Sequence, residues 1–145
     1  MQDLGHWTTE IQEIPENFYG FIYRITNTTN DRAYIGKKQA RSIRKLKPLK
    51  GKKRGRRKEV ETDWKTYTGS SPELNNDIEL LGKDKFKFEI IRFCECKWEL
   101  AYYEAQQQFA ENVLLYPNLY YNGIINLRIN KAPKETLSKY VLIPD

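Results

Sequence analysis

The chain has 145 residues, 39% of them hydrophobic, a size that suits one domain with one core. The chain has a single histidine, His6, which excludes sites built on several histidines, such as those of zinc proteases, HNH nucleases and Cys-His zinc fingers. Its two cysteines, Cys94 and Cys96, lie too close together in the sequence for an ordinary structural disulfide. The net charge of +6 is unevenly distributed: residues 37–58 hold 13 of the 25 basic residues and no acidic one, which predicts contact with a polyanion, most simply nucleic acid.

The first elements in chain order predict a β-hairpin. Residues 1–17 read as a polar leader without the layout of a signal peptide. Residues 18–25 are rich in β-formers, residues 26–31 in turn formers, and residues 32–36 form a second short strand.

The basic segment follows, and its composition predicts a helix near Gln39 that gives way to a loop. Pro48, Gly51 and Gly55 prevent a helix from continuing through the whole segment. A second helix is predicted from Ser70 onward, because the sequence Ser-Ser-Pro-Glu combines a serine cap with proline in the first turn, and it should end at Gly82.

The second half of the chain predicts a strand, a long helix and a returning tail. Apolar and charged residues alternate over residues 85–94, as in a strand with one face on the core. Residues 98–115 read as the longest helix, and residues 120–127 should pack back on the sheet. The expected buried stripe of that helix recurs every four residues, at Ala101, Ala105, Phe109 and Val113, with Glu104 beside it.

Together these elements predict an α+β fold in which helices flank a small antiparallel three-stranded β-sheet. We expect a single domain over residues 1–145, with a basic insert at about residues 37–62. No apolar run approaches the roughly 20 residues of a membrane span, so no membrane partner is expected and the expected location is the cytoplasm.

The hairpin resembles the GIY-YIG nucleases, whose two signature tripeptides lie on adjacent strands. The chain has Gly20-Phe21-Ile22-Tyr23, with one extra residue, and Tyr34-Ile35-Gly36; further along come Glu104 and Asn122 in a Tyr-Asn-Gly turn, so the resemblance spans residues 18–127. The run from Asp63-Trp64-Lys65 to Gly69-Ser70-Ser71, with the basic insert, also resembles the Seg-type GIY-YIG endonucleases of phages.

The resemblance implies a metal-dependent DNA endonuclease that leaves 5′-phosphate and 3′-hydroxyl ends. Tyr23 would be the general base, Tyr34 its partner near the scissile phosphate, and Glu104 the ligand of one divalent metal ion, Mg²⁺ or alternatively Mn²⁺. Asn122 would have a structural role, and Lys65 or Tyr67 would complete the site.

The resemblance also implies a catalytic arginine on a helix about ten residues after the second tyrosine, which points to Arg44. Because the basic insert shifts the register, Arg41 and the cluster Arg54, Arg56 and Arg57 remain alternatives.

A tyrosine base raises a problem of charge. A free phenol has a pKa of about 10, so forming phenolate at pH 7 costs about 4 kcal/mol. Lys37 and Lys38 directly follow the second signature and would favour phenolate, or would instead grip phosphate.

The expected partner is double-stranded DNA, bound through the basic segment with salt-sensitive affinity. A homodimer on DNA, the target sequence and the choice between homing, restriction and degradation are left open; if a phage encodes the chain, the location becomes the host-cell cytoplasm. The residues expected to contact DNA are Lys37, Arg41, Lys50, Lys52, Lys53, Arg54, Arg56 and Arg57.

Two alternatives remain. A module that binds nucleic acid without catalysis would use the same basic segment and exposed aromatic residues. A nuclease of the PD-(D/E)XK type would use Glu95-Cys96-Lys97, with Asp77 or Asp84 as the upstream carboxylate.

Overall fold

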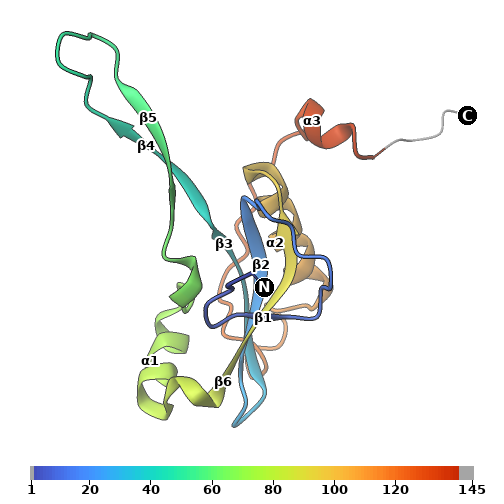
Figure 1. The fold of residues 1–145 in the computed structure, drawn as a ribbon. Coiled ribbons are helices and arrows are strands. Elements are labelled where there is room, and N and C mark those ends of the chain that lie inside the picture. The colour runs from blue at the N-terminus through green and yellow to red at the C-terminus, as the bar shows by residue number, and fades with distance from the viewer. Residues whose placement is uncertain (1, 141–145) are drawn as a thin grey trace, which may run out of the picture.

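A computed structural model describes residues 2–140 and has an α+β fold (Figure 1). Its main sheet has four strands in the order β1-β6-β2-β3. Strands β2, β3 and β6 are antiparallel, as expected, but the two-residue strand β1 adds a parallel pairing at the outer edge of β6, so the sheet is mixed. The strands are β1 (Thr8–Thr9), β2 (Gly20–Asn27), β3 (Arg32–Gln39) and β6 (Phe86–Cys94).

The predicted hairpin is confirmed, because β2 and β3 pair over their full lengths, from Gly20 opposite Gln39 to Asn27 opposite Arg32. Its turn is held by the side chain of Asn27, whose Oδ1 accepts hydrogen bonds from the backbone N–H and the hydroxyl of Thr29. Asp31 takes the left-handed conformation, with φ of 60°, which Asp tolerates better than most residues.

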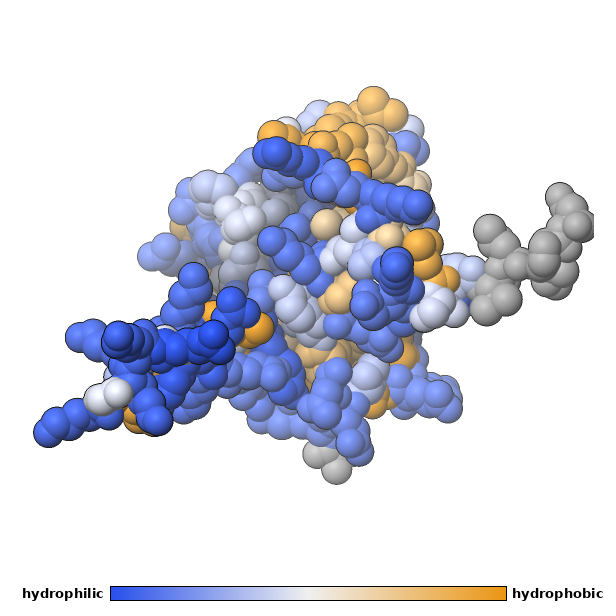
Figure 2. Space-filling view, turned by 90° about the horizontal axis from the view of Figure 1, so that it is seen from above, coloured by the Kyte–Doolittle hydropathy of each residue, from blue (hydrophilic) through white to orange (hydrophobic). Residues whose placement is uncertain are grey.

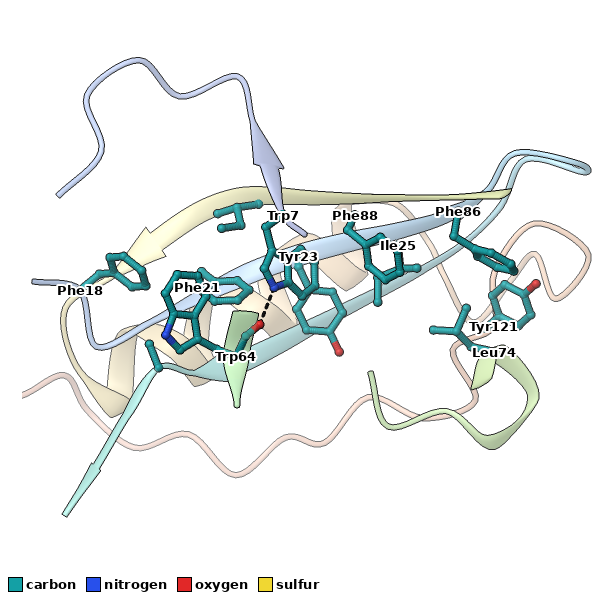
Figure 3. Close-up of a cluster of buried hydrophobic side chains, with 12 residues drawn as sticks. Trp7, Phe18, Phe21, Tyr23, Ile25, Trp64, Leu74, Phe86, Phe88 and Tyr121 are labelled. Carbon is teal, nitrogen blue, oxygen red and sulfur yellow. Dashed lines mark hydrogen bonds between the residues drawn. The ribbon is translucent and has the colours of Figure 1, made fainter. Parts of the chain in front are cut away.

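One face of the sheet carries an aromatic core to which the N-terminal segment contributes (Figure 3). The expectation of a polar leader is wrong at Trp7, which is 3% exposed and donates a hydrogen bond of 2.5 Å from its indole N–H to the carbonyl of Trp64. Trp7 also packs against Phe21, Tyr23 and Phe88 of the sheet, with ring centroids 5.1–5.6 Å apart. The short 3-10 helix η1 (Trp64–Thr66) is thereby attached to the sheet.

The opposite face is covered by α2 (Lys97–Ala110), which packs on Ile22 and Ile35. The expected stripe is only partly right: Ala105 and Val113 are buried, but Phe109 is 53% exposed, and Leu100 and Tyr103 face the core instead. Four residues turn a helix about 40° beyond a full turn, so a strict four-residue repeat drifts off the buried face.

The helix α1 (Pro72–Leu81) agrees with its predicted start and end. The Ser71 hydroxyl accepts a hydrogen bond of 3.2 Å from the N–H of Leu74, proline occupies the first turn, and Gly82 ends the helix with a φ of 96°. Another 3-10 helix, η2 (Lys83–Lys85), then leads into β6.

The basic segment departs most from expectation, because it forms a two-stranded antiparallel ribbon rather than a helix followed by a loop. Strand β4 (Arg41–Leu46) pairs with β5 (Arg56–Glu61), and only residues 47–55 form the tip. In a helix the like charges of Arg41, Arg44 and Lys45 would lie on one side and repel one another. In the ribbon Arg41 instead forms a salt bridge of 3.1 Å with Glu59 of the paired strand. We call this hairpin, residues 41–61, the arm; it projects from the body of the protein (Figures 1 and 2).

The tail packs back on the sheet, as predicted. Tyr120 forms a parallel bridge with Ala33 on the free side of β3, and the N–H of Tyr121 donates to the carbonyl of Ala33 at 2.8 Å. A four-residue helix, α3 (Lys134–Leu137), follows. Over residues 2–140, no helix combines the length and the apolar character needed to cross a bilayer.

Candidate active site

The two signature tyrosines lie side by side on one face of the β2–β3 hairpin. Tyr23 pairs with Gly36 and Tyr34 with Ile25, which places both side chains on the face of the aromatic core. Their ring centroids are 6.1 Å apart, and the ring of Tyr67 lies edge-on to Tyr23 at the same distance. Tyr23 is 1% exposed, whereas Tyr34 and Tyr67 are partly exposed, so Tyr23 forms the buried floor of this cluster.

The glycine of the second signature makes room for Tyr23. A Cβ added at Gly36 would lie 2.5 Å from the hydroxyl oxygen of Tyr23, so any larger residue would displace the phenol. Gly20, three positions before Tyr23, points to the opposite face instead, where a Cβ would lie 3.0 Å from Leu100 of α2. The Cβ would also lie 2.5 Å from the carbonyl oxygen of Lys38, so the glycine of the first signature allows the close approach of β3 as well as the packing of α2.

Glu104 lies on α2, which covers the opposite face of the sheet, and its carboxylate extends to Lys37 of β3. Its carboxylate accepts a hydrogen bond from the backbone N–H of Lys37, and the Lys37 ammonium lies 4.0 Å away. The side chain is 17% exposed, and its burial raises the pKa of Glu104, partly offset by Lys37. The negative charge of Glu104 in turn contributes to the raised pKa values of Tyr23 and Tyr34, which places all three in one electrostatic environment.

The tail covers the outer edge of β3 at Ala33 and Ile35, and Glu104 lies further along β3, near Lys37. Ala33 donates its outward N–H to Leu119 at 2.8 Å, and Ile35 donates to Oδ1 of Asn122 at 3.0 Å. The amide of Asn122 returns a hydrogen bond of 2.7 Å to the carbonyl of Ile35, which also accepts one from Gln108 of α2. Asn122 and Gln108 thus tie the tail and α2 to the strand that carries Tyr34.

A family model described as the GIY-YIG domain of the putative endonuclease segE matches residues 6–125. This chain belongs to the GIY-YIG family. No curated protein and no solved structure matched it. The match covers the hairpin, the arm, α1, α2 and the Asn122 turn, so it includes every element that forms the tyrosine cluster.

The cations of this GIY-YIG domain are arranged differently from expectation. Lys38 lies on the site face of β3, with its ammonium 4.1 Å from the centre of the Tyr67 ring and 2.7 Å from Asp63. Lys65, predicted to complete the site, instead pairs with Asp3 at 3.3 Å. Of the two residues predicted as alternatives, Tyr67 lies in the cluster and Lys65 points away from it.

None of the predicted arginines lies among the tyrosines. Arg44 is on β4, ten residues of strand beyond Tyr34, and its expected helix does not exist. At about 3.3 Å per residue, this separation corresponds to at most about 33 Å of chain. The alternatives Arg41, Arg54, Arg56 and Arg57 also belong to the arm, as do Lys50, Lys52 and Lys53.

Sequence reasoning missed one arginine next to the site. Arg32 lies two residues before Tyr34 on β3, stacks over the Tyr121 ring at 4.3 Å and forms a salt bridge with Glu73. Among the described residues its buried Nε has no hydrogen-bond partner. The alternation along the strand, which puts residues 32, 34, 36 and 38 on one side, was the signal that could have identified it.

The pKa values of the two signature tyrosines of this GIY-YIG domain are raised rather than lowered. Burial raises the pKa of Tyr23 well above its usual value, with further contributions from Tyr34, Tyr67 and Glu104. Burial also raises the pKa of Tyr34, although its hydrogen bond of 3.0 Å with the Ser70 hydroxyl opposes this. Lys37 and Lys38, expected to favour phenolate or to grip phosphate, pair with Glu104 and Asp63, and their role toward the tyrosines stays a prediction.

The donor set fits a Mg²⁺ site that depends on the substrate. No group of three or more His, Cys, Asp or Glu residues that could hold a metal is present within residues 2–140. The side chain of Glu104 is 17% exposed, and the ammonium of Lys37 lies 4.0 Å from its carboxylate. Mg²⁺ is commonly held by one or two carboxylates, with waters and substrate phosphates completing its shell, and one glutamate at the open edge of β3 suits that arrangement.

The alternative motif Glu95-Cys96-Lys97 is not assembled into a site. Glu95 follows the end of β6 and pairs with Lys139 at 2.5 Å, whereas Asp84 precedes the start of that strand. The nine residues of β6 separate them by about 30 Å. Asp77 accepts a hydrogen bond from the Tyr121 hydroxyl, which also contacts Asn27 opposite Phe86, again at the far end of β6.

Proposed function

We propose that this GIY-YIG endonuclease domain hydrolyses phosphodiester bonds of double-stranded DNA with the help of a divalent metal ion, leaving 5′-phosphate and 3′-hydroxyl ends. The observation that carries the proposal is the convergence of Tyr23, Tyr34, Tyr67 and Lys38 on one sheet face with Glu104 at the adjoining open strand edge. Family membership supports the same activity.

Each side chain has a role that follows from its position. Tyr34, which is partly exposed, and Ser70, which is exposed, present hydroxyls that donate hydrogen bonds to the scissile phosphate. Lys38, beside Tyr67, adds positive charge on the phosphate side of the cluster. Glu104 holds Mg²⁺ or Mn²⁺, which when bound supplies positive charge that stabilises the leaving 3′ oxygen.

Tyr23 takes the proton of the attacking water. Its phenol is protonated in the free protein, since burial raises the pKa of Tyr23 well above its usual value. Deprotonation thus costs more than the roughly 4 kcal/mol of a free phenol at pH 7. The positive charges gathered around the bound substrate offset this cost, so the base forms only in the loaded complex.

One tyrosine cluster per chain cuts one strand at a time. Cleavage of both strands requires two copies of the chain on DNA, either together as a homodimer or in succession. We propose a role in phage homing, which the resemblance to Seg-type endonucleases implies, with restriction or degradation as alternatives.

A module that binds nucleic acid without cutting it is the second candidate. It is favoured by the arm, which carries the basic residues away from the tyrosine cluster. It gives no role to the juxtaposition of Glu104 with Tyr23 and Tyr34.

A plasmid cleavage assay tests the proposal. Wild-type protein, Glu104→Gln and the control Glu79→Gln, an exposed carboxylate on α1, are incubated with supercoiled plasmid in Mg²⁺ or in EDTA. We expect nicked or linear product with the wild type and the control in Mg²⁺ only, and none with Glu104→Gln. Binding without cleavage of either the plasmid or DNA from the native source would instead favour the binding module.

A further inference from the structure

The arm has two chemically different faces. In an antiparallel pair, directly opposed residues share a face. One face therefore carries three cross-strand pairs: Ser42 with Val60, Arg44 with Lys58, and Leu46 with Arg56. The other face carries the remaining three: Arg41 with Glu61, Ile43 with Glu59, and Lys45 with Arg57. We call them the Arg44 face and the Lys45 face.

Only the Arg44 face lacks acidic residues. On the Lys45 face, Glu59 binds Arg41 at 3.1 Å, and Glu61 accepts a hydrogen bond of 2.8 Å from the Trp64 indole. Within the described chain, neither Arg44 nor Lys58 forms a salt bridge, and both side chains are exposed. The positive charges of the Arg44 face are therefore not neutralised by acidic residues of the arm. Of the two faces, it is the one that suits binding to DNA.

The Arg44 face lies on the chain segment that directly follows the strand of the tyrosine cluster. Strand β3 places Tyr34, Gly36 and Lys38 on the side of the aromatic core, and Ala40, 2% exposed, belongs to the same core. Ala40 is a bend between β3 and β4, and Ser42 and Arg44 follow it on β4. The base of the arm is fixed at this point, because Thr62 donates hydrogen bonds to the carbonyls of Ala40 and Gln39 at 2.9 and 2.7 Å.

We propose that the arm enters the major groove of double-stranded DNA with its Arg44 face toward the base edges, and so selects the sequence that the tyrosine cluster cuts. The proposal rests on the proposed endonuclease function for the link to cutting. The major groove is about 12 Å wide and admits a two-stranded β-ribbon. Arg44 and Lys58 supply donors for guanine O6 and N7, and the tip residues Lys50, Lys52, Lys53 and Arg54 meet phosphates.

The geometry predicts where the selected bases lie. Tyr34 and Arg44 are separated by at most about 33 Å of strand, which is close to one turn of DNA, roughly 34–36 Å. Sequence preference should therefore appear up to about one helical turn to one side of the cut, with weak preference at the cut itself.

Two neighbouring cross-strand pairs provide a matched comparison. Arg44→Gln/Lys58→Gln removes two cations from one face, and Lys45→Gln/Arg57→Gln removes two from the other, one register step further along the arm. All four side chains are exposed and make no salt bridge within residues 2–140, so both variants should keep the melting temperature of the wild type.

The first measurement is binding of each variant, in EDTA, to a 40-base-pair duplex that the wild type selects from a random-sequence pool; it needs no cleavage and so tests the arm separately from the endonuclease. We expect binding at least ~10-fold weaker for Arg44→Gln/Lys58→Gln and less than ~3-fold weaker for Lys45→Gln/Arg57→Gln. Equal losses would mean that the arm is an undirected cationic tether and would overturn the proposal, as would no loss in either.

A second measurement tests the groove. Methylation of guanine N7, which blocks the major groove, should prevent binding of the wild type, whereas netropsin in the minor groove should not. The opposite pattern would overturn the proposal even if the arm binds DNA. Failure of the endonuclease would show itself differently, as intact plasmid in Mg²⁺ with these binding results unchanged.

Discussion

Gly36 lies directly beneath the phenol of Tyr23, so closely that a Cβ there would come within 2.5 Å of the hydroxyl oxygen. Backbone atoms of one strand thus form the wall against which the proposed base rests. Because Tyr23 is 1% exposed and held by Trp7 and Phe21, it has little room to move aside.

This contact predicts that Gly36→Ala displaces Tyr23 and disrupts both packing and cleavage. Overpacking of a filled core costs about 1–3 kcal/mol, so the melting temperature should fall by several degrees. Cleavage should be lost even at temperatures where the variant remains folded. The control is Gly123→Ala, because no atom lies within 4 Å of a Cβ at that position and the variant should melt and cut as the wild type does.

The raised pKa of Tyr23 predicts a cleavage rate that increases with pH. Only the small phenolate fraction can accept a proton from water, so the single-turnover rate should increase about tenfold per pH unit between pH 6 and 8. Replacing Tyr23 with 3,5-difluorotyrosine, whose phenol is more acidic, should shift the profile to lower pH. The same replacement at Tyr19, whose side chain packs on the α2 face, should leave the profile in place; a shift at Tyr19 but not at Tyr23 would argue against Tyr23 as the base.

The positions of Lys38 and Arg44 predict that the two cations affect different steps. Lys38→Gln should reduce the single-turnover rate at saturating enzyme by roughly 100-fold, because its charge lies beside Tyr67 in the cluster. Arg44→Gln should leave that rate unchanged and weaken DNA binding, because β4 carries it away from the tyrosines. A lower rate for Arg44→Gln at saturation would restore it as the catalytic arginine.

His6 predicts a loss of stability in acid. Its ring stacks on Phe88 with centroids 4.0 Å apart, and neither ring nitrogen has a hydrogen-bond partner among the described residues. Burial, reinforced by Lys83, lowers the pKa of His6 from 6.5 to about 4, so the neutral ring is the form that packs.

A lowered histidine pKa means that the unfolded chain takes up a proton before the folded protein does. The stability that depends on neutral His6 is present above pH 6.5 and is lost progressively as the pH falls from 6.5 to 4. His6→Phe keeps the stacking and removes the titration, so its melting temperature should fall less than that of the wild type over this interval. If the melting temperatures of the two proteins fell equally between pH 6.5 and pH 4, His6 would not be the cause of the loss of stability in acid.

The sequence by itself determined the local features of this protein. The β2–β3 hairpin, both ends of α1, the strand before α2 and the return of the tail all follow from turn residues, caps and periodicity within short windows. The resemblance of residues 18–127 to the GIY-YIG nucleases, rather than turn residues, caps or periodicity, identified the two tyrosines, Glu104 and Asn122 as the residues to examine.

Tertiary structure decided what depends on pairing between distant segments. Strand β4 forms because residues 56–61 pair with it, and Trp7 is buried because β1 joins β6 some 80 residues later. The partner of β1 lies far outside the span over which hydrophobic periodicity can be read. The partner of β4 lies closer, but neither strand of the arm alternates apolar and polar residues, so periodicity gave no sign of the ribbon. The same reason moved Arg44 away from the tyrosines, brought Lys38 to Tyr67, and replaced the expected activation of Tyr23 with a raised pKa, since burial is a property of the assembled core.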